Sequence, residues 1–419
     1  MSQNYQGSDA RQDSPCFITG INYWPAGKAM YWWRAFEAQE VEEDFKRLAA
    51  NNFGLVRIFL LWEDFQPRPE TISTVSLDYL KTTADLAQAC GLGLMPTFFC
   101  GHMSGLNWLP SWMLSPGKVE SRFPVCSDNR LSWAPIRNCY IDQAVIDAQA
   151  WQIQTVAAAL RDHKAVFAYD LGNEASNWVT PPEREDARRW LQIMKAQIKQ
   201  YSGGASVTLG MHAEDLEEDR RLWPQDAARS CDFLCMHGYP FYLDWVDNPA
   251  DPDLVPFLGI ITAWLGRKPV LLQEFGMPTQ SVLPPLGEVA DESSRSCPLW
   301  PETEAALYYQ QVLPRLREAG MMGAMAWCAA DYAPSLWDRP PLDYNQHERF
   351  FGLFRHNGTA KPAVGTFRVC HNNSIDLNPA PIQIKYTWLS DTDPDNFYHD
   401  PRNNLTRLYQ KYKMWLKAR

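Results

Sequence analysis

The stretch Val166-Phe-Ala-Tyr-Asp-Leu-Gly-Asn173-Glu174 is an apolar run that ends in a carboxylate. A second stretch, Pro269-Val-Leu-Leu-Gln-Glu274-Phe-Gly276, has the same form. Short runs of large apolar residues are typical of strands buried on both faces of a parallel sheet. In a closed parallel barrel, the C-terminal ends of all strands open onto one face. We therefore expect Glu174 and Glu274 to face one cleft.

Apolar runs of this kind recur along the chain, and most precede a segment whose apolar residues have helical spacing. The runs are Phe17–Tyr23, Leu55–Leu61, Gly93–Phe99, Val166–Leu171, Ser206–Met211, Phe233–Met236, Val270–Gln273 and Gly323–Trp327. The helical segments include Ala38–Asn51, Leu77–Cys90, Ile141–His163, Arg184–Tyr201 and Glu302–Ala319. Alternating strands and helices predict an α/β fold with a parallel sheet. Eight units predict a closed (β/α)8 TIM barrel.

The chain divides into three parts by composition. Residues 1–15 are polar and are expected to form a flexible N-terminus, and residues 16–365 carry the barrel pattern. Residues 366–419 are expected to form a short C-terminal extension packed on the barrel. Within this extension, the sequence predicts a strand-like run at Ile382–Leu389 and a helix from about Asn403 to Lys417.

Three long loops follow predicted strands, at Phe99–Tyr140, Phe275–Pro301 and Cys328–Phe351. Loops of this length in a compact domain are usually functional. All three follow strand C-termini, so we expect them to narrow an open groove into a pocket. They contain several tryptophans, namely Trp108, Trp112, Trp133, Trp300 and Trp337. Packing of these loops on the barrel flank, which would leave the cleft open, is the alternative.

Composition excludes several classes of partner. The formal net charge of −10 argues against nucleic-acid binding, which needs a basic surface. The sequence has no apolar stretch long enough to span a membrane. Residues 1–15 lack the apolar region of a signal peptide, so we expect a cytoplasmic protein, or a secreted one if a leader has been removed. The cysteines and histidines lack metal-site spacing, so no metal or cofactor is implied.

Further polar and aromatic residues occur at the same ends of the predicted strands. Arg57 lies inside an apolar run, and an arginine there is rarely buried without a carboxylate partner. The others at strand ends are His102, Asn173, His237, Tyr239 and Trp327. Two carboxylates in one cleft are the minimum apparatus for hydrolysing a glycosidic bond. The whole set therefore predicts a site that binds and cleaves a carbohydrate.

With these residues in barrel order, the chain resembles a retaining β-glycosidase of glycoside hydrolase clan A, most similar to family 5. The resemblance rests on Asn173-Glu174, on Gln273-Glu274-Phe-Gly276 and on the closing segment from Phe351 to Ala363, and covers about residues 17–365. It implies that Glu174 is the acid/base and Glu274 the nucleophile. Gly20-Ile-Asn-Tyr-Trp-Pro, followed by Met30-Tyr-Trp-Trp, resembles the mannoside-cleaving branch of that family.

The resemblance also implies roles for the supporting residues. Arg57 and Tyr239 would hydrogen-bond the nucleophile, and His237 would lie beside the acid/base. Asn173 would contact the sugar 2-hydroxyl, and Trp327 would form the floor under the sugar whose bond is cleaved. His102 matches the family pattern less closely, because its long loop aligns in more than one way.

The sequence leads to an exo-acting β-mannosidase that takes β-linked oligosaccharides and cleaves them by double displacement. A nearby cation lowers a carboxylate pKa and desolvation raises one, so two environments can give two glutamates opposite roles. An endo-β-1,4-mannanase or endo-β-1,4-glucanase with an open cleft is one alternative. A carbohydrate-binding barrel without turnover is another, disfavoured because both carboxylates are present. The sequence leaves the oligomeric state open.

Overall fold

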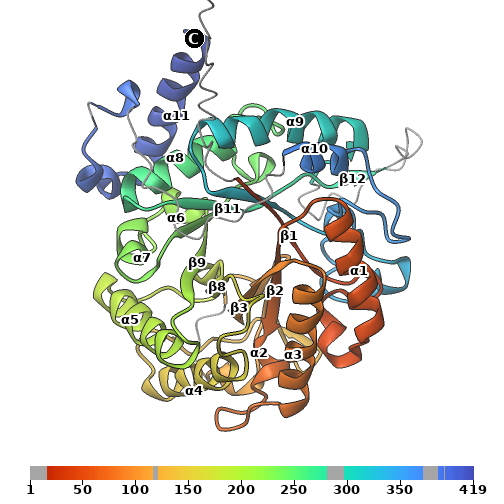
Figure 1. The fold of residues 1–419 in the computed structure, drawn as a ribbon. Coiled ribbons are helices and arrows are strands. Elements are labelled where there is room, and N and C mark those ends of the chain that lie inside the picture. The colour runs from red at the N-terminus through yellow and green to blue at the C-terminus, as the bar shows by residue number, and fades with distance from the viewer. Residues whose placement is uncertain (1–16, 117–120, 281–296, 371–385, 391) are drawn as a thin grey trace, which may run out of the picture.

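The computed structural model describes residues 17–116, 121–280, 297–370, 386–390 and 392–419. It contains a closed barrel of parallel strands in the order β1-β14-β11-β10-β9-β8-β3-β2 (Figure 1). The strands are β1 (Ile18–Asn22), β2 (Leu55–Leu61), β3 (Gly93–Cys100), β8 (Ala168–Asn173), β9 (Ser206–His212), β10 (Leu234–His237), β11 (Val270–Phe275) and β14 (Gly323–Ala326). The predicted TIM barrel is confirmed, and each of the predicted apolar runs overlaps one of these strands.

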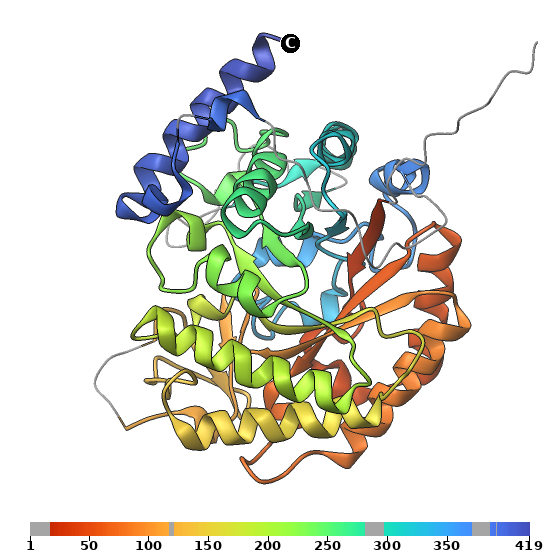
Figure 2. The ribbon, with the colours of Figure 1, turned by 60° about the vertical axis from the view of Figure 1, so that its left-hand side comes forward.

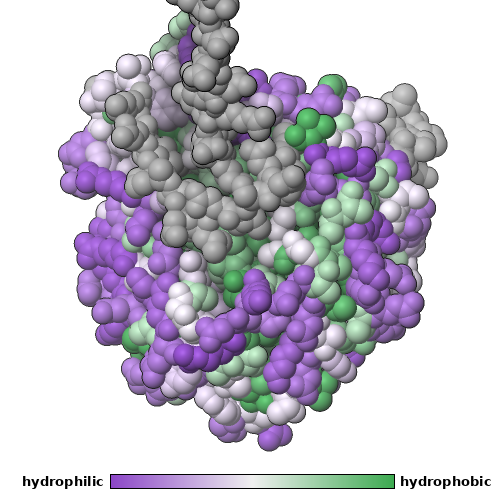
Figure 3. Space-filling model, in the orientation of Figure 1, coloured by the Kyte–Doolittle hydropathy of each residue, from purple (hydrophilic) through white to green (hydrophobic). Residues whose placement is uncertain are grey.

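Helices form a layer around the barrel (Figures 1 and 2). They are α1 (Ala38–Ala50), α2 (Trp62–Phe65), α3 (Thr74–Ala89), α4 (Gln143–Ala159), α5 (Arg184–Tyr201), α6 (Glu214–Glu217), α7 (Pro224–Ser230), α8 (Leu254–Gly266), α9 (Glu302–Glu318), α10 (Ala363–Cys370) and α11 (Pro401–Lys417). Helix α5 shows why they form: Trp190, Leu191, Met194 and Ile198 recur at helical spacing and are buried. Hydrophilic residues cover much of the periphery on the face drawn in Figure 3. No described helix is long and apolar enough to cross a bilayer.

The C-terminal extension differs from the predicted pattern in two places. The predicted strand-like run falls partly on residues 382–385, outside the described part of the chain, and its remainder includes a 3-10 turn at Thr387–Leu389. The predicted boundary at residue 365 falls inside α10, which packs against α9. The terminal helix α11 lies alongside α8, where the Tyr409 and Phe257 ring centroids are 4.9 Å apart. The predicted N-terminus, residues 1–15, lies outside the described residues.

The long loops contain short strands of their own. The loop after β3 carries a small sheet made of β4 (His102–Met103), β5 (Leu106–Trp108), β6 (Val125–Ser127) and β7 (Arg130–Ser132). The loop after β11 pairs β12 (Thr279–Gln280) with β13 (Trp300–Pro301), and residues 281–296 between them are not described. The loop after β14 includes the 3-10 turns Pro334–Leu336 and Gln346–Phe350.

The loop tryptophans pack mainly within protein. Trp108 is buried against Tyr31, and the Trp112 indole N–H donates to the Gln66 carbonyl. Trp300 is also buried, whereas Trp133 is half exposed at the loop surface. At least Trp108 and Trp300 therefore hold their loops in place.

Candidate active site

Glu274 lies at the C-terminal end of β11, buried between a cation and a phenol. Arg57 Nη1 donates to its Oε1 at 2.5 Å, and the Tyr239 hydroxyl donates to its Oε2 at 3.0 Å. Burial raises the pKa of Glu274, and the His237 imidazole and the Arg57 guanidinium offset only part of that rise. Two donors that hold both oxygens favour the ionised form and fix its direction. This environment suits a carboxylate that attacks as a nucleophile.

Arg57 is itself held by a second buried carboxylate, Asp170. Asp170 Oδ2 accepts from Arg57 Nη2 at 2.7 Å and from the Thr97 hydroxyl at 2.9 Å, and its Oδ1 accepts from the Gly210 N–H at 2.9 Å. A Cβ on Gly210 would lie 2.7 Å from the Gly172 carbonyl oxygen and 3.1 Å from Arg57 Nη2. Glycine at this position therefore leaves room for the polar network inside the barrel.

Glu174 follows β8 and has a left-handed backbone, with φ 47° and ψ 49°. Such a conformation is uncommon for a residue with a side chain, and conformations of this kind cluster at functional sites. Its Oε1 lies 2.9 Å from His237 Nδ1, and its Oε2 accepts from Asn177 Nδ2 at 3.0 Å. Burial favours the neutral acid, but the imidazoles of His212, His237 and His102 outweigh burial and lower the pKa of Glu174.

The orientation of His237 follows from the hydrogen bonds around it. Gln273 Nε2 donates to Asp170 Oδ2 at 3.0 Å, which turns Gln273 Oε1 toward His237 Nε2 at 2.9 Å. Nε2 therefore carries a proton, and Nδ1 is the nitrogen that exchanges a proton with Glu174. Burial opposes a charge on His237, but the carboxylates of Glu274 and Glu174 raise its pKa. Glu174 and His237 are therefore placed to share one proton across this hydrogen bond.

The two glutamates are close enough for direct cooperation. One carboxylate oxygen of each lies within 4.8 Å of the other and of a His237 ring nitrogen. Retaining glycosidases hold their carboxyl groups about 5–5.5 Å apart, and inverting enzymes about 6.5–9.5 Å apart, to leave room for water. The separation of these two oxygens is below the range given for inverting enzymes.

The same three groups are the one cluster among the described residues with a geometry that could hold a metal ion. The Arg57 guanidinium, at 2.5 Å from Glu274, already supplies a positive charge there. A metal ion beside it would be repelled, so the donor set fits a proton-transfer site better than a metal site.

The other predicted residues gather around this pair. Asn173 Oδ1 accepts from Arg57 Nη2 at 2.8 Å, and its Nδ2 donates to the His102 carbonyl at 2.9 Å. His102 Nε2 lies 4.0 Å from Glu174 Oε2, and burial lowers the pKa of this histidine. Trp327 is buried at the end of β14, with its ring 5.9 Å from Phe59. The structure therefore brings all of the predicted site residues to one end of the barrel.

Sequence reasoning missed four residues that contact this set. Asp170 and Gln273 carried a usable signal, because each is a polar residue within an apolar strand, as Arg57 is. Asn177 lies one 3-10 turn after Glu174, where no pattern marks it. Glu348 comes from an irregular loop, and its Oε2 accepts from the Trp327 indole N–H at 3.3 Å. Burial raises the pKa of Glu348 to about 7.

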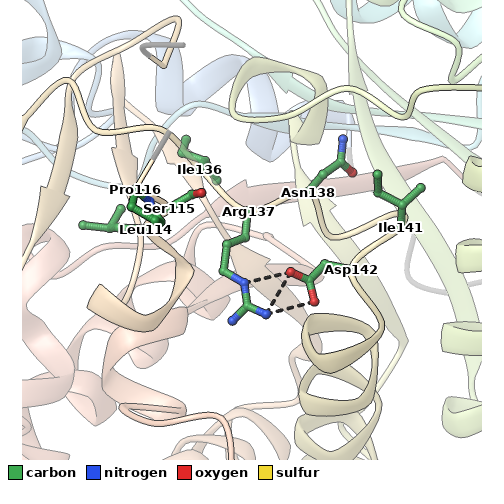
Figure 4. Close-up of a pocket in the computed structure, with 8 residues that line it drawn as sticks. All are labelled: Leu114, Ser115, Pro116, Ile136, Arg137, Asn138, Ile141 and Asp142. Carbon is green, nitrogen blue, oxygen red and sulfur yellow. Dashed lines mark hydrogen bonds and ion pairs between the residues drawn. The ribbon is translucent and has the colours of Figure 1, made fainter. Parts of the chain in front are cut away.

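Two cavities lie near the long loops. One, of about 540 Å³, is lined by Arg122, Arg220 and Asn177 among others, and so adjoins the acid/base side of the pair through Asn177. The other, of about 440 Å³, is shown in Figure 4. Arg137 and Asp142 form an ion pair at 2.8 Å within it, and its lining includes none of the predicted site residues. The cavity beside Asn177 is therefore the better candidate for a continuation of the site around Glu174.

No family model and no curated protein sequence matches the chain. Solved structures do match. The exo-beta-1,4-mannosidase from Opitutaceae bacterium strain TAV5 is 26% identical, with a TM-score of 0.66, over 84% of this chain and 59% of that one. A GH5_18 structure from Streptomyces cattleya in complex with GlcNAc is 23% identical, with a TM-score of 0.69, over 85% of this chain and 80% of that one.

A GH5_18 structure from Bifidobacterium longum subsp. longum is 20% identical, with a TM-score of 0.67, over 84% of this chain and 78% of that one. The chain shares its barrel fold with these GH5_18 structures and with the exo-beta-1,4-mannosidase. The residues that the sequence resemblance predicts as acid/base and nucleophile are the two carboxylates at the ends of β8 and β11.

Proposed function

We propose that this protein is a retaining, exo-acting β-mannosidase that cleaves oligosaccharides by double displacement. The observation that carries the proposal is the pair of glutamates within 4.8 Å, one held by Arg57 and Tyr239, the other by His237 and Asn177. Mannoside specificity draws support from the 26% identical exo-beta-1,4-mannosidase. A variant of the Streptomyces cattleya GH5_18 protein that binds Manb1-4GlcNAc, at 23% identity, is consistent with it.

In the first step, the Glu274 carboxylate attacks the anomeric carbon of the terminal sugar while the glycosidic C–O bond breaks. Glu174 donates its proton to the departing oxygen. That proton comes from His237 Nδ1, one hydrogen bond of 2.9 Å away. Arg57 and Tyr239 keep Glu274 ionised and aimed until the covalent bond forms.

In the second step, Glu174 acts as a base. It takes a proton from a water molecule, the water oxygen attacks the anomeric carbon, and the bond to Glu274 breaks. Two inversions leave the β-configuration unchanged. Asn177 holds the second oxygen of Glu174, so the same carboxyl keeps its direction through both steps.

Exo action draws support from the way the loops join on one side of the barrel mouth. Asn345, in the loop after β14, donates to the Ser104 carbonyl in the loop after β3 at 2.7 Å. Tyr31, in the loop after β1, donates to the Pro340 carbonyl at 2.6 Å and packs edge-on against Trp108. Loops joined in this way would block one end of a groove and leave a pocket for a terminal sugar.

The test combines a substrate panel with product stereochemistry. Purified protein is assayed with nitrophenyl β-mannoside, β-glucoside and β-galactoside, and the first product is followed by proton NMR. The proposal predicts the highest kcat/KM on the β-mannoside and a β-configured sugar as first product. A preference for another glycoside would overturn the mannoside assignment alone, whereas an α-configured first product would overturn the retaining mechanism.

A further inference from the structure

Glu348 is a third carboxyl at the active site, and its two oxygens have different surroundings. It lies in the 3-10 turn Gln346–Phe350 after β14 and is buried. Its Oε2 accepts from the Ser104 hydroxyl at 2.9 Å and from the Trp327 indole at 3.3 Å. Within the described residues no hydrogen bond reaches Oε1, and the His347 Nε2 atom lies 3.6 Å from it. One oxygen therefore holds the loops together, while the other can accept a hydrogen bond.

The charges of Glu174 and Glu274 act on Glu348. The Glu274 and Glu174 carboxylates both help to raise the pKa of Glu348, after the larger effect of its burial. Glu348 in turn helps burial to raise the pKa of Tyr239, whose hydroxyl donates to Glu274. Glu348 is therefore coupled electrostatically to the two glutamates and to the phenol that holds Glu274.

The position of Glu348 relative to Trp327 decides what it can bind. A sugar ring stacks its C–H face on an indole, and its hydroxyls then point outward around the rim of the stack. Glu348 sits at the N–H edge of that indole, where such a hydroxyl would lie. The buried side chain of Glu348 has a pKa of about 7, and above that pH its carboxylate is a strong acceptor for a hydroxyl.

We propose that Glu348 is a specificity-determining residue, whose Oε1 accepts a hydrogen bond from one hydroxyl of the terminal sugar. This inference rests on the proposed glycosidase function. Ser104, which donates to Glu348, lies in the loop whose carbonyl accepts a hydrogen bond from Asn345. Glu348 therefore lies where the loops join, at the closed end of the proposed pocket. A further sugar attached at that hydroxyl would remove the donor and collide with the joined loops. Glu348 would thus favour terminal sugars over internal ones.

The test is Glu348→Gln, which keeps the size of the side chain and an acceptor oxygen for Ser104 and Trp327. The matched control is Glu217→Gln, because Glu217 is also buried and accepts the Trp245 indole N–H. Wild type and both variants are assayed on the nitrophenyl glycoside that wild type cleaves fastest. They are also assayed on three analogues of that substrate, lacking the 3-, 4- or 6-hydroxyl. Thermal unfolding shows that each variant is folded.

On the parent substrate, Glu348→Gln should lower kcat/KM at least about tenfold, as expected for a lost bond to a charged group. On one deoxy analogue the loss should largely disappear, because wild type cannot form the bond either. Glu217→Gln should leave kcat/KM unchanged on all four substrates. An equal loss on every analogue would mean that Glu348 only holds Trp327, and would overturn the proposal, as would no loss at all.

Failure of the proposed function gives a different result, because wild type then cleaves no β-glycoside. In that case, titration calorimetry with free mannose, glucose, galactose and the matching deoxy sugars gives the same comparison through Kd. Glu348→Gln should bind more weakly than wild type only to those sugars that carry one particular hydroxyl, and not to the deoxy sugar that lacks it. This result would support the inference even without turnover. Equal binding by both proteins, or no binding by wild type, would overturn it.

Discussion

Arg57 connects the fold to the chemistry at the scale of a single residue. Its guanidinium is fully buried and divides its donors among Asp170, Glu274 and the Asn173 amide. A buried cation needs compensating acceptors, and Asp170 supplies one that takes no part in bond breaking. Glu274 therefore shares its cation with a structural carboxylate, which in the proposed mechanism keeps the guanidinium in place when Glu274 becomes an ester.

Asp170→Asn should destabilise the protein and lower its activity, because Arg57 and Gln273 lose the charge that orients them. Breaking a buried pair by removing one partner costs about 3–5 kcal/mol. Denaturant unfolding measures this loss, and kcat should fall in the same variant. The exposed Asp78, paired with Lys81, provides the control, and Asp78→Asn should unfold like wild type. A stable, active Asp170→Asn would contradict the role given to the network.

The two glutamates should respond differently to azide. In Glu274→Ala, azide should take the place of the missing carboxylate and yield an α-configured glycosyl azide from an activated substrate. In Glu174→Ala, the covalent intermediate still forms, so azide should yield the β-configured product. Both variants should lose several orders of magnitude in kcat without azide. The same azide product from both variants would show that the roles are wrongly assigned.

Glu348 should make stability depend on pH. Its pKa in the folded protein is raised to about 7, from an ordinary value of 4.5. The neutral acid stabilises the folded state. Its contribution to the free energy of unfolding is fully present below about pH 4.5 and is lost as the pH rises through about 7. Glu348→Gln should therefore show a smaller fall in Tm between pH 5 and pH 8 than wild type. Burial also raises the pKa of Glu63 to about 7, so part of the fall in Tm with pH remains in both proteins. Identical slopes would contradict the buried, ionisable state of Glu348.

These residues also show which parts of the site could be predicted from the sequence. Arg57 was recognisable because a charge inside an apolar run demands a partner, and the same reasoning applied to the same strand as Glu174 would have found Asp170. Glu348 was out of reach. It lies in an irregular loop, and only the three-dimensional path of that loop brings it beside Trp327 and Ser104.

At the scale of elements, helix α8 explains what the C-terminal extension contributes. Nearly every residue of Leu254–Gly266 is buried, including Phe257, Ile260 and Ile261. An outer helix of a barrel normally exposes one polar face, whereas a helix that is apolar all round must be covered on every side. Helix α11 packs beside α8 and shields it. The absence of helical periodicity in α8 is the physical reason that no helix was predicted there.

Removing an aromatic ring from α11 should therefore destabilise the barrel. Tyr412 is buried and its ring stacks on Phe257 of α8 at 5.7 Å between centroids. Tyr412→Ala should cost about 3 kcal/mol, by comparison with other buried aromatic truncations. Met414, two residues away and 65% exposed, provides the control, and Met414→Ala should leave the unfolding midpoint unchanged. A two-step unfolding curve, with the barrel transition unaffected, would mean that α11 is an independent appendage.

At the scale of the whole molecule, long-range hydrogen bonds join the loops that follow the strand C-termini. Their positions after strand C-termini were predictable, and so was their place on the catalytic face. Their connections were not, because Asn345 to Ser104 and Tyr31 to Pro340 join segments far apart in sequence. The strand order follows from alternation alone, whereas the shape of the pocket depends on these few long-range contacts.

The joined loops predict the mode of attack on a polymer. Soluble mannan should release reducing sugar while its viscosity falls slowly, because only chain ends fit the pocket. Asn345→Ala removes one of the two connections and should raise the ratio of viscosity loss to reducing sugar released. A rapid fall in viscosity with wild type, with little reducing sugar, would show endo attack and an open cleft.

The most direct measurement is covalent trapping of the intermediate, followed by mass spectrometry of peptides. The protein is incubated with 2-deoxy-2-fluoro-β-mannosyl fluoride, which forms the ester quickly and hydrolyses slowly. We predict one sugar adduct per chain, located on Glu274, and none on Glu274→Ala. An adduct on another residue, or none while an unfluorinated β-mannoside is still cleaved, would contradict double displacement by Glu274 and Glu174.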